Sequence, residues 1–308
     1  MEKQSLSKFL LMQFALLLLV VVAIPEFSLP SVTSGALFSS FLSFLVLISA
    51  VVFYVIALLF FNKKASAAGS KLDLKFMICS ALGALMVLYA NLPELQSSAQ
   101  AYAEDIVIDA IVSVVGLALL VYSFVISSKT LGCSFTSVPA KGSYVILMSI
   151  LVRTFNSMSD SWLVGIAALV ALFIYWKSLT KLTEGTDEAI SAGVSKLKTA
   201  IILSLVAVVV GWIPVLGWIA APILMIIAFV MELMAYGKFT ASTSFGELGQ
   251  KGARKLKTSM ILYIVGAGLS IIPFLGSILD SILCIVAFVL VFLGWKGIIL
   301  GFEEKSKA

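Results

Sequence analysis

The stretch GWIPVLGW, residues 211–218, places a proline and two glycines in the middle of a long apolar run. A later stretch, SIIPFLGS at residues 270–277, interrupts a second apolar run with the same I-P-x-L-G core. The two prolines, Pro214 and Pro273, are 59 residues apart (273 − 214 = 59). This pairing indicates that the chain uses one structural unit at least twice.

The two stretches belong to longer segments of 35 residues that align without a gap. KLKTAIILSLVAVVVGWIPVLGWIAAPILMIIAFV, from Lys196, aligns with KLKTSMILYIVGAGLSIIPFLGSILDSILCIVAFV, from Lys255. Shared aliphatic residues follow from composition, but the shared KLKT, I-P-x-L-G and AFV segments are more specific. The alignment therefore predicts an internal duplication.

Weaker copies of the turn lie upstream, in AIPEFS around Pro25 and in NLPELQ around Pro93. Pro93 lies 121 residues before Pro214, close to two repeat lengths, and the polar segment 153–161 falls between them. We expect a further turn in that segment, although it contains no proline. The predicted turn residues are Pro25, Pro93, Pro214, Gly217, Pro273 and Gly276.

Chain length explains why a turn is needed. A continuous helix over residues 199–236 would measure about 57 Å at about 1.5 Å per residue, whereas the hydrocarbon core of a bilayer is about 30 Å thick. We expect Pro214 to start the returning helix and Gly211 to close the preceding one. The alternative interpretation is a helix broken by proline and glycine that lines a substrate site.

Composition points to a membrane protein, because 61% of the residues are hydrophobic and only 12% are charged, against about 25% charged residues in soluble domains. The apolar runs predict an all-α fold: a polytopic helical membrane protein with about ten transmembrane helices in five tandem α-hairpins. Residues 1–308 would form a single integral membrane domain. The hairpins are expected at approximately 9–61, 72–128, 142–178, 196–238 and 255–297.

Basic residues mark every second predicted loop, with Arg153 as the exception, so the positive-inside rule predicts that both termini are cytoplasmic. We expect the membrane to be the plasma membrane. Residues 1–23 also resemble a signal peptide. We favour a retained first helix, because Pro25 fits the pattern of turns. The net charge of +5 is explained by these loops, and we expect no nucleic-acid partner.

The segments before the two aligned copies are expected to form short amphipathic helices that lie on the inner membrane surface and run into the spans. Their lysines would meet anionic lipid. Ile190, Val194 and Leu197 follow helical spacing, and Ser244 with Glu247 matches a capping box. A solvated loop is the alternative. The first arm of each aligned pair has about 15 residues, so its turn would lie below the outer surface or its lysines would snorkel.

Several site types are excluded by the sequence. Histidine is absent, which removes His-based triads and His-metal sites. Cys79, Cys133 and Cys284 are widely separated, so no CxxC site exists, and no phosphate-binding loop occurs. We therefore predict no catalytic residues, no metal and no cofactor.

Ionisable residues at membrane depth are functional candidates because their burial is costly. Asp105 and Asp109 lie one helical turn apart and could hold a cation or relay a proton, or could form an acidic first turn. Arg153 and Asp160 flank the polar segment and could pair. Asp280 is the most informative candidate, because the aligned position of the other copy is Ala221. We expect Asp280 to face the bundle interior, or to lie at the outer interface.

The pattern favours a non-catalytic multi-pass membrane protein with a structural, assembly or membrane-organising role, and not an enzyme. The alternative is a parallel-repeat transporter or channel for a small solute or ion. A two-helix repeat keeps one orientation, so an inverted-repeat mechanism is not expected. The expected partners are the lipid bilayer, anionic lipid, and either a membrane protein or a second copy of the chain.

Overall fold

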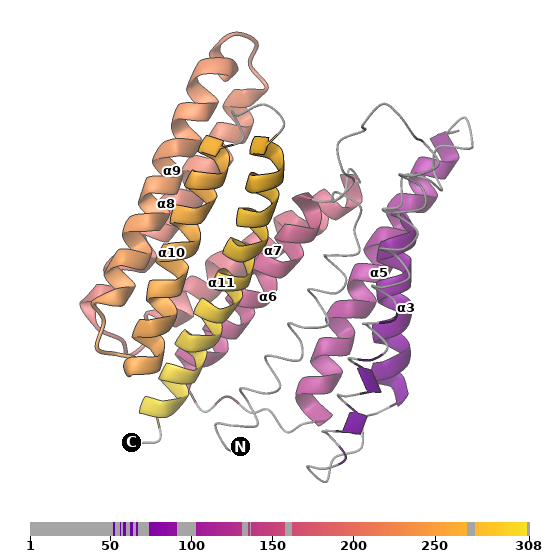
Figure 1. Ribbon diagram of the computed structural model, residues 1–308, viewed down its shortest axis with the longest axis horizontal. Coiled ribbons are helices and arrows are strands. Elements are labelled where there is room, and N and C mark those ends of the chain that lie inside the picture. The colour runs from indigo at the N-terminus through magenta and orange to yellow at the C-terminus, as the bar shows by residue number, and fades with distance from the viewer. Residues whose placement is uncertain are drawn as a thin grey trace. The chain divides into compact units, whose positions relative to one another are not determined.

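The computed structural model describes residues 74–90, 103–130, 135, 137–157, 162–269 and 275–306, with a few single positions between 52 and 66. In these parts all regular structure is α-helical (Figure 1). The labelled helices are α3 (Leu74–Ala90), α5 (Ala103–Thr130), α6 (Val138–Ser157), α7 (Trp162–Leu182), α8 (Glu188–Gly211), α9 (Leu216–Thr240), α10 (Glu247–Leu269) and α11 (Leu275–Lys305).

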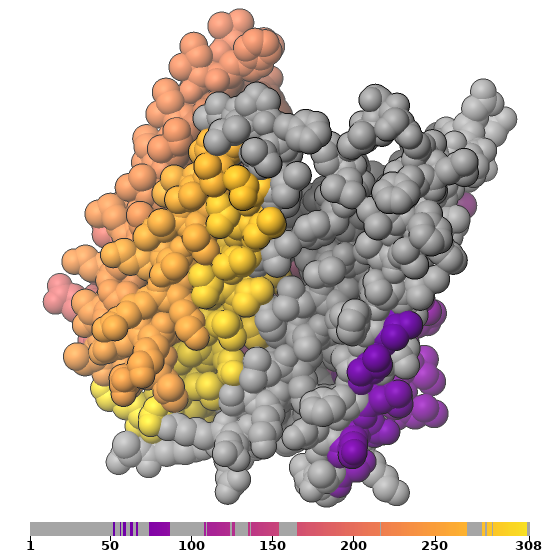
Figure 2. Space-filling model, viewed as in Figure 1, coloured from indigo at the N-terminus to yellow at the C-terminus, as the bar shows by residue number. Residues whose placement is uncertain are grey.

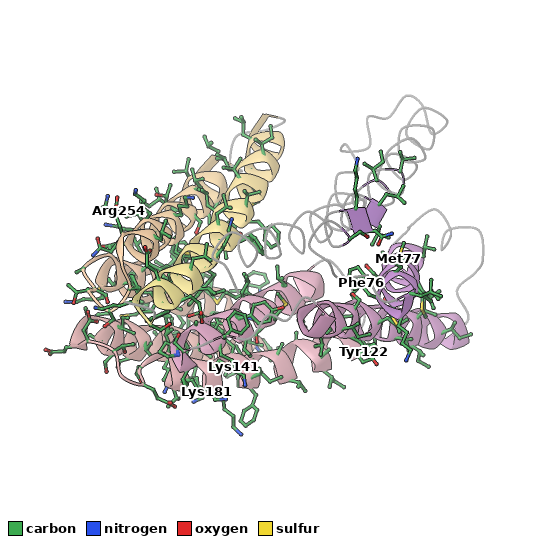
Figure 3. The ribbon with its side chains drawn as sticks, turned by 90° about the horizontal axis from the view of Figure 1, so that it is seen from below. Phe76, Met77, Tyr122, Lys141, Lys181 and Arg254 are labelled. Carbon is green, nitrogen blue, oxygen red and sulfur yellow. The ribbon has the colours of Figure 1, made fainter. Side chains whose placement is uncertain are left out.

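The chain divides into two compact units. The first contains residues 1–134 and 149–172, and the second contains residues 135–148 and 173–308. In the first unit α3 packs on α5, where Gly83 allows close approach: a Cβ atom added there would lie 2.8 Å from the Gly116 carbonyl oxygen. Phe76 on α3 is buried, whereas Tyr122 on α5 is exposed (Figure 3).

The second unit contains two helix pairs, α8 with α9 and α10 with α11, and α10 also contacts α9. The start of α6 also meets the end of α7: a Cβ atom added at Gly142 would lie 3.2 Å from the Ser178 carbonyl oxygen. Lys141 and Lys181 lie close to this contact (Figure 3).

Helices α8 and α10 bury corresponding faces. The buried residues of α8 are Ile190, Gly193, Val194, Leu197, Ala200, Ile201 and Ala207. Those of α10 are Gly249, Gly252, Ala253, Leu256, Ser259, Met260 and Gly266. Each member of the second set follows its counterpart by 59 residues, as in 249 − 190 = 59. Corresponding positions of the two helices therefore face into the protein, including positions that precede the aligned sequences.

The predicted amphipathic segments form the first turns of α8 and α10, and they run without a break into the apolar segments, as expected. Ile190, Val194 and Leu197 have the expected helical spacing, but they are buried within the protein and do not lie on a lipid surface. A Cβ atom added at Gly193, on the same face, would lie 3.0 Å from the Ala235 carbonyl oxygen of α9. The partner of this apolar stripe is a neighbouring helix.

The predicted capping box at Ser244 is wrong. Helix α10 begins at Glu247, and Glu247 binds Lys251 in an i,i+4 ion pair of 2.6 Å. The Ser244 hydroxyl accepts a hydrogen bond from the Asp187 N–H at 2.7 Å. This serine therefore joins two loops rather than capping the helix that follows it.

The chain reverses at Pro214, which lies between the end of α8 at Gly211 and the start of α9 at Leu216. We expected Pro214 to lie in the first turn of α9, but it belongs to the turn between the two helices. Val215 precedes α9 with φ 65°, a conformation that is rare for a β-branched residue. Gly211 is followed by Trp212 in right-handed geometry, so this end needs no left-handed glycine cap.

Gly217 has a direct steric role in the turn. A Cβ atom added there would lie 2.8 Å from the Val210 and Gly211 carbonyl oxygens and 2.9 Å from the Gly211 Cα atom. Since all three atoms belong to the backbone, no side-chain rotation could relieve the clash. This contact explains why glycine occupies the last position of the I-P-x-L-G core in this turn.

Gly217→Ala is therefore expected to destabilise the α8–α9 pair by about 1–3 kcal/mol, the usual cost of overpacking. Gly211→Ala is the matched control, because its added Cβ atom would meet only the Ala221 Cβ atom, at 3.8 Å. Thermal unfolding of the detergent-solubilised variants measures the difference. Equal stability of the two variants would contradict the packing argument.

Four helical segments in the described parts are long and apolar enough to cross a membrane: Gly165–Leu182, Glu188–Gly211, Gly217–Thr240 and Ile282–Lys305. Helix α10 is not among them, and its first half carries a cluster of charged residues: Glu247, Lys251, Arg254, Lys255 and Lys257. Shorter apolar helices cover Leu74–Met86 and Ala110–Ser123. The ten predicted spans include segments before residue 74 that lie largely outside the described residues.

Candidate functional site

Asp280 lies on α11, on the side that faces α10. It is half-buried, and its carboxylate is directed at Gly266 of α10, where an added Cβ atom would lie 2.5 Å from the Asp280 Oδ1 atom. Cys284, one turn further along α11, donates a weak hydrogen bond from Sγ to the same oxygen at 3.5 Å. The Asp280 side chain thus faces a neighbouring helix of its own unit.

Two differences between the aligned copies account for this arrangement. Asp280 corresponds to Ala221 of α9, and Gly266 corresponds to Ala207 of α8. Where the other copy has two alanines, this copy has a larger acidic residue opposite a smaller one. The methyl group missing from Gly266 leaves the space that the Asp280 carboxylate occupies.

The structure gives the positions of the other predicted site residues only in part. Helix α5 begins at Ala103, so Asp105 and Asp109 lie in its first two turns, although their side chains are outside the described residues. Arg153 is exposed on α6, and its suggested partner Asp160 lies outside the residues that the structure describes. The predicted turn residues Pro25, Pro93 and Pro273 are also outside it, whereas Gly276 lies in the first turn of α11.

A second polar cluster, centred on Asp187, was not found from the sequence. Asp187 is the N-cap of α8, and its Oδ1 atom accepts from the Ile190 N–H at 3.1 Å. Its Oδ2 atom accepts from the Ser242 hydroxyl at 2.8 Å, the Thr243 N–H at 2.7 Å and the Ser244 N–H at 3.2 Å. One carboxylate therefore joins the loop before α8 to the loop before α10.

The electrostatics of Asp187 follow from these contacts. Burial raises the pKa of a carboxyl group, but here the hydrogen bonds from the Ile190 N–H, the Ser242 hydroxyl and the Thr243 and Ser244 N–H groups outweigh it. The net result is a pKa below the ordinary value of 3.8. Asp187 is therefore ionised near neutral pH and acts as an acceptor for these donors.

The end of α11 carries a further buried carboxylate that sequence analysis overlooked. Glu303 accepts a hydrogen bond from the Ser137 N–H at 3.4 Å, and the Ser137 hydroxyl accepts from the Ala140 N–H at 3.2 Å. A carboxylate at this position complements the N-terminal end of α6. Lys305 in turn donates to the Thr243 carbonyl oxygen, so the end of α11 also holds the α9–α10 loop.

One buried donor in the second unit has no acceptor among the described residues: the indole N–H of Trp295. Trp295 is fully buried on α11 and packs edge-to-face on Phe239 of α9, with ring centroids 6.5 Å apart.

The described residues contain no group of three or more His, Cys, Asp or Glu side chains that could hold a metal ion. Comparisons of the chain with known protein families, curated proteins and solved structures find no match. The fold and its four apolar candidate spans are consistent with the class of helical integral membrane proteins.

Proposed function

We propose that this chain is a non-catalytic multi-pass membrane protein that organises the membrane or supports assembly within it. In this proposal about ten transmembrane helices form five tandem hairpins, and both termini are cytoplasmic in the plasma membrane. The partners are the bilayer, anionic lipid at the basic loops, and a second copy or another membrane protein.

The observation that carries the proposal is the close packing of α10 on α11. A Cβ atom added at Gly252 would lie 2.5 Å from the Gly294 carbonyl oxygen, and one added at Gly297 would lie 2.8 Å from the Gly252 Cα atom. Helices whose backbones meet leave no room for a solute path between them. This close contact favours a structural role for the α10–α11 pair.

Exposed apolar side chains support lipid as the main partner. On α9, Ile219, Ile223 and Ile226 are each more than half exposed. These residues share that helix with Gly217 and Trp218, within a segment whose first charged residue is Glu232. Such a surface is unfavourable in water and suits acyl chains.

Topology is tested with single cysteines placed in the loop around Lys63 and in the 94–104 loop, after Cys79, Cys133 and Cys284 are replaced. An impermeant thiol reagent on intact cells is expected to label the acidic 94–104 loop only, because basic loops stay inside. Labelling of both loops after cell lysis is the control. Labelling at Lys63, or protection of 94–104, on intact cells would contradict the topology.

The role itself is tested by reconstituting the purified protein into phosphatidylcholine vesicles that contain anionic lipid. A membrane-organising protein is expected to change vesicle size and shape without dissipating a potassium or proton gradient. Heat-unfolded protein at the same lipid ratio is the control. A gradient that collapses only with the folded protein would favour the transporter or channel alternative.

The position of Asp280 favours the transporter or channel alternative, because a carboxylate directed at a neighbouring helix could bind a cation. Asp280→Asn keeps the shape and removes the charge, and Ala221→Asn changes the corresponding position of the other pair. If Asp280 is a site, the first variant is expected to lose function at normal membrane abundance, and the second is not. Unchanged function in Asp280→Asn would leave Asp280 without a functional role.

A further inference from the structure

The α8–α9 hairpin ends in an exposed apolar surface, here called the hairpin tip and defined as residues 211–219. Three of its large apolar side chains are highly exposed: Trp212 at 80%, Val215 at 77% and Trp218 at 86%. The tip projects beyond the described ends of α10 and α11 (Figures 1 and 2). These large apolar groups are therefore not covered by the described helices of their own unit.

The backbone of the hairpin tip is suited to an environment with little water. The Trp212 N–H donates to the Val209 carbonyl oxygen at 3.2 Å, and the Ile213 N–H donates to that of Val210 at 2.9 Å. The Gly217 N–H donates to the Ile213 carbonyl oxygen at 2.8 Å, and Pro214 has no N–H. In lipid, backbone polar groups need such internal partners, and these groups have them.

The length of α8 limits how far the tip can reach. Trp212 lies 14 residues beyond Lys198 (212 − 198 = 14), which is about 21 Å along a helix, against a hydrocarbon core of about 30 Å. The Lys198 Nζ atom donates to the Thr180 hydroxyl oxygen at 2.9 Å near the end of α7. A hairpin with Lys198 at one membrane boundary therefore brings its tip toward the opposite boundary and does not carry it far into water.

We propose that the hairpin tip is a lipid-binding surface. In this proposal Trp212, Val215 and Trp218 occupy the boundary between acyl chains and headgroups in the leaflet opposite Lys198. Tryptophan is enriched at this boundary because its ring is apolar and its N–H is polar. The proposal rests on the membrane insertion assumed in the proposed function, but not on a non-catalytic role.

The test is a depth measurement by spin labelling in phosphatidylcholine vesicles. Single labels are attached to the Val215→Cys and Ile219→Cys variants of a chain whose native cysteines are replaced by serine or alanine. Glu184→Cys, in the exposed loop before α8, is the control for water, and Ile226→Cys on α9 is the control for lipid. Collision with oxygen reports lipid, and collision with a water-soluble nickel chelate reports water.

The tip labels are expected to collide with the nickel chelate several-fold less often than the Glu184→Cys label, and with oxygen nearly as often as the Ile226→Cys label. Equal nickel access at the tip and at Glu184→Cys would overturn the proposal by placing the tip in water. Low access to both reagents would also overturn it, since a protein partner would then cover the tip. Nickel access at Ile226→Cys would instead contradict membrane insertion and with it the proposed function.

A second measurement leaves the native cysteines in place. Intrinsic tryptophan fluorescence is recorded in vesicles whose lipids carry bromine on the acyl chains near the headgroup. The full chain is expected to lose a larger fraction of its fluorescence than the Trp212→Phe/Trp218→Phe double variant. Equal fractional loss would show that the two tip tryptophans do not contact this lipid region.

Discussion

Gly252→Ala is expected to force α10 away from α11 and to lower the ratio of folded to unfolded protein by roughly tenfold to a hundredfold. An added Cβ atom would lie 2.5 Å from the Gly294 carbonyl oxygen, 2.9 Å from the Ile298 nitrogen and 3.0 Å from the Gly297 carbonyl carbon. All three contacts are backbone atoms, so the helices must shift. Overpacking of this kind costs about 1–3 kcal/mol or more, and each 1.4 kcal/mol is about a factor of ten.

The same helix supplies the matched control. Gly268 lies on α10, and a Cβ atom added there would have no neighbour within 4 Å. Gly268→Ala is expected to preserve stability or raise it slightly, because alanine favours helix more than glycine does. Membrane abundance and the thermal midpoint in detergent measure both variants. Equal losses in the two variants would show that the effect belongs to glycine replacement in general and not to this contact.

The glycines of α11 explain why the effect should be concentrated at this contact. Gly294 and Gly297 both face Gly252, and Gly301 faces Gly249, where an added Cβ atom would lie 2.7 Å from the Gly249 nitrogen. Close approach of helix backbones through small residues is a common way for helices to associate in membranes. These glycines therefore form a continuous line of contact along the pair.

The helical spacing of apolar residues predicted the apolar stripe of α8, but it did not predict which part of the protein covers that stripe. Ile190, Val194 and Leu197 stand at helical spacing, and all three are buried. A stripe of this kind packs equally well against lipid or against another helix, so its pattern cannot choose between them. The choice depends on α9, whose Ala235 and Phe239 approach Gly193 from more than forty residues away.

Comparison of the two aligned copies identified Asp280 as an unusual position, which the sequence around it alone did not. The replacement of Ala221 by Asp280 marked this position as unusual, and the accompanying replacement of Ala207 by Gly266 supplies the space beside it. Both differences are visible in the alignment. That they face one another depends on how α10 and α11 pack, which local sequence does not determine.

Asp187 shows where sequence analysis reaches its limit. An aspartate directly before a helical apolar stripe is a recognised N-cap signal, and it would have predicted the hydrogen bond from Ile190. The contacts with residues 242–244 involve positions 55 to 57 residues away. No local pattern indicates such pairing, because the packing of the two helix pairs is what brings these loops together.

Asp187→Ala is accordingly expected to be the most damaging single change in the loops, with a loss of about 2–3 kcal/mol. Removing an N-cap side chain costs about 1 kcal/mol, and hydrogen bonds to a charged group contribute about 1.5–3 kcal/mol each, without simple additivity. The Ser242 hydroxyl, which is fully buried, would lose its carboxylate acceptor. Thermal unfolding and proteolysis near Lys238 and Lys251 report the global loss and the release of the loop.

Asp187→Asn separates the two roles of this residue. Asparagine caps helices about as well as aspartate, so the bond from Ile190 can be retained. Its neutral amide is a weaker acceptor for the Ser242, Thr243 and Ser244 donors, and its NH₂ group cannot accept. We expect Asp187→Asn to release the loop to proteases while losing less stability than Asp187→Ala. Glu184→Ala, an exposed carboxylate in the same loop, should change neither measurement.

The pH dependence of stability gives an independent check on the Asp187 contacts. Because the pKa of Asp187 in the folded protein lies below its ordinary value of 3.8, the ionised carboxylate stabilises the folded state at pH values above 3.8. That contribution declines as the pH falls through 3.8 and is lost below the folded pKa, where both states are protonated. Asp187→Asn cannot titrate, so its stability should fall less over this acidic range than that of the unmodified chain. Parallel decline of the two proteins would mean that other carboxylates, and not Asp187, control acid unfolding of the loop junction.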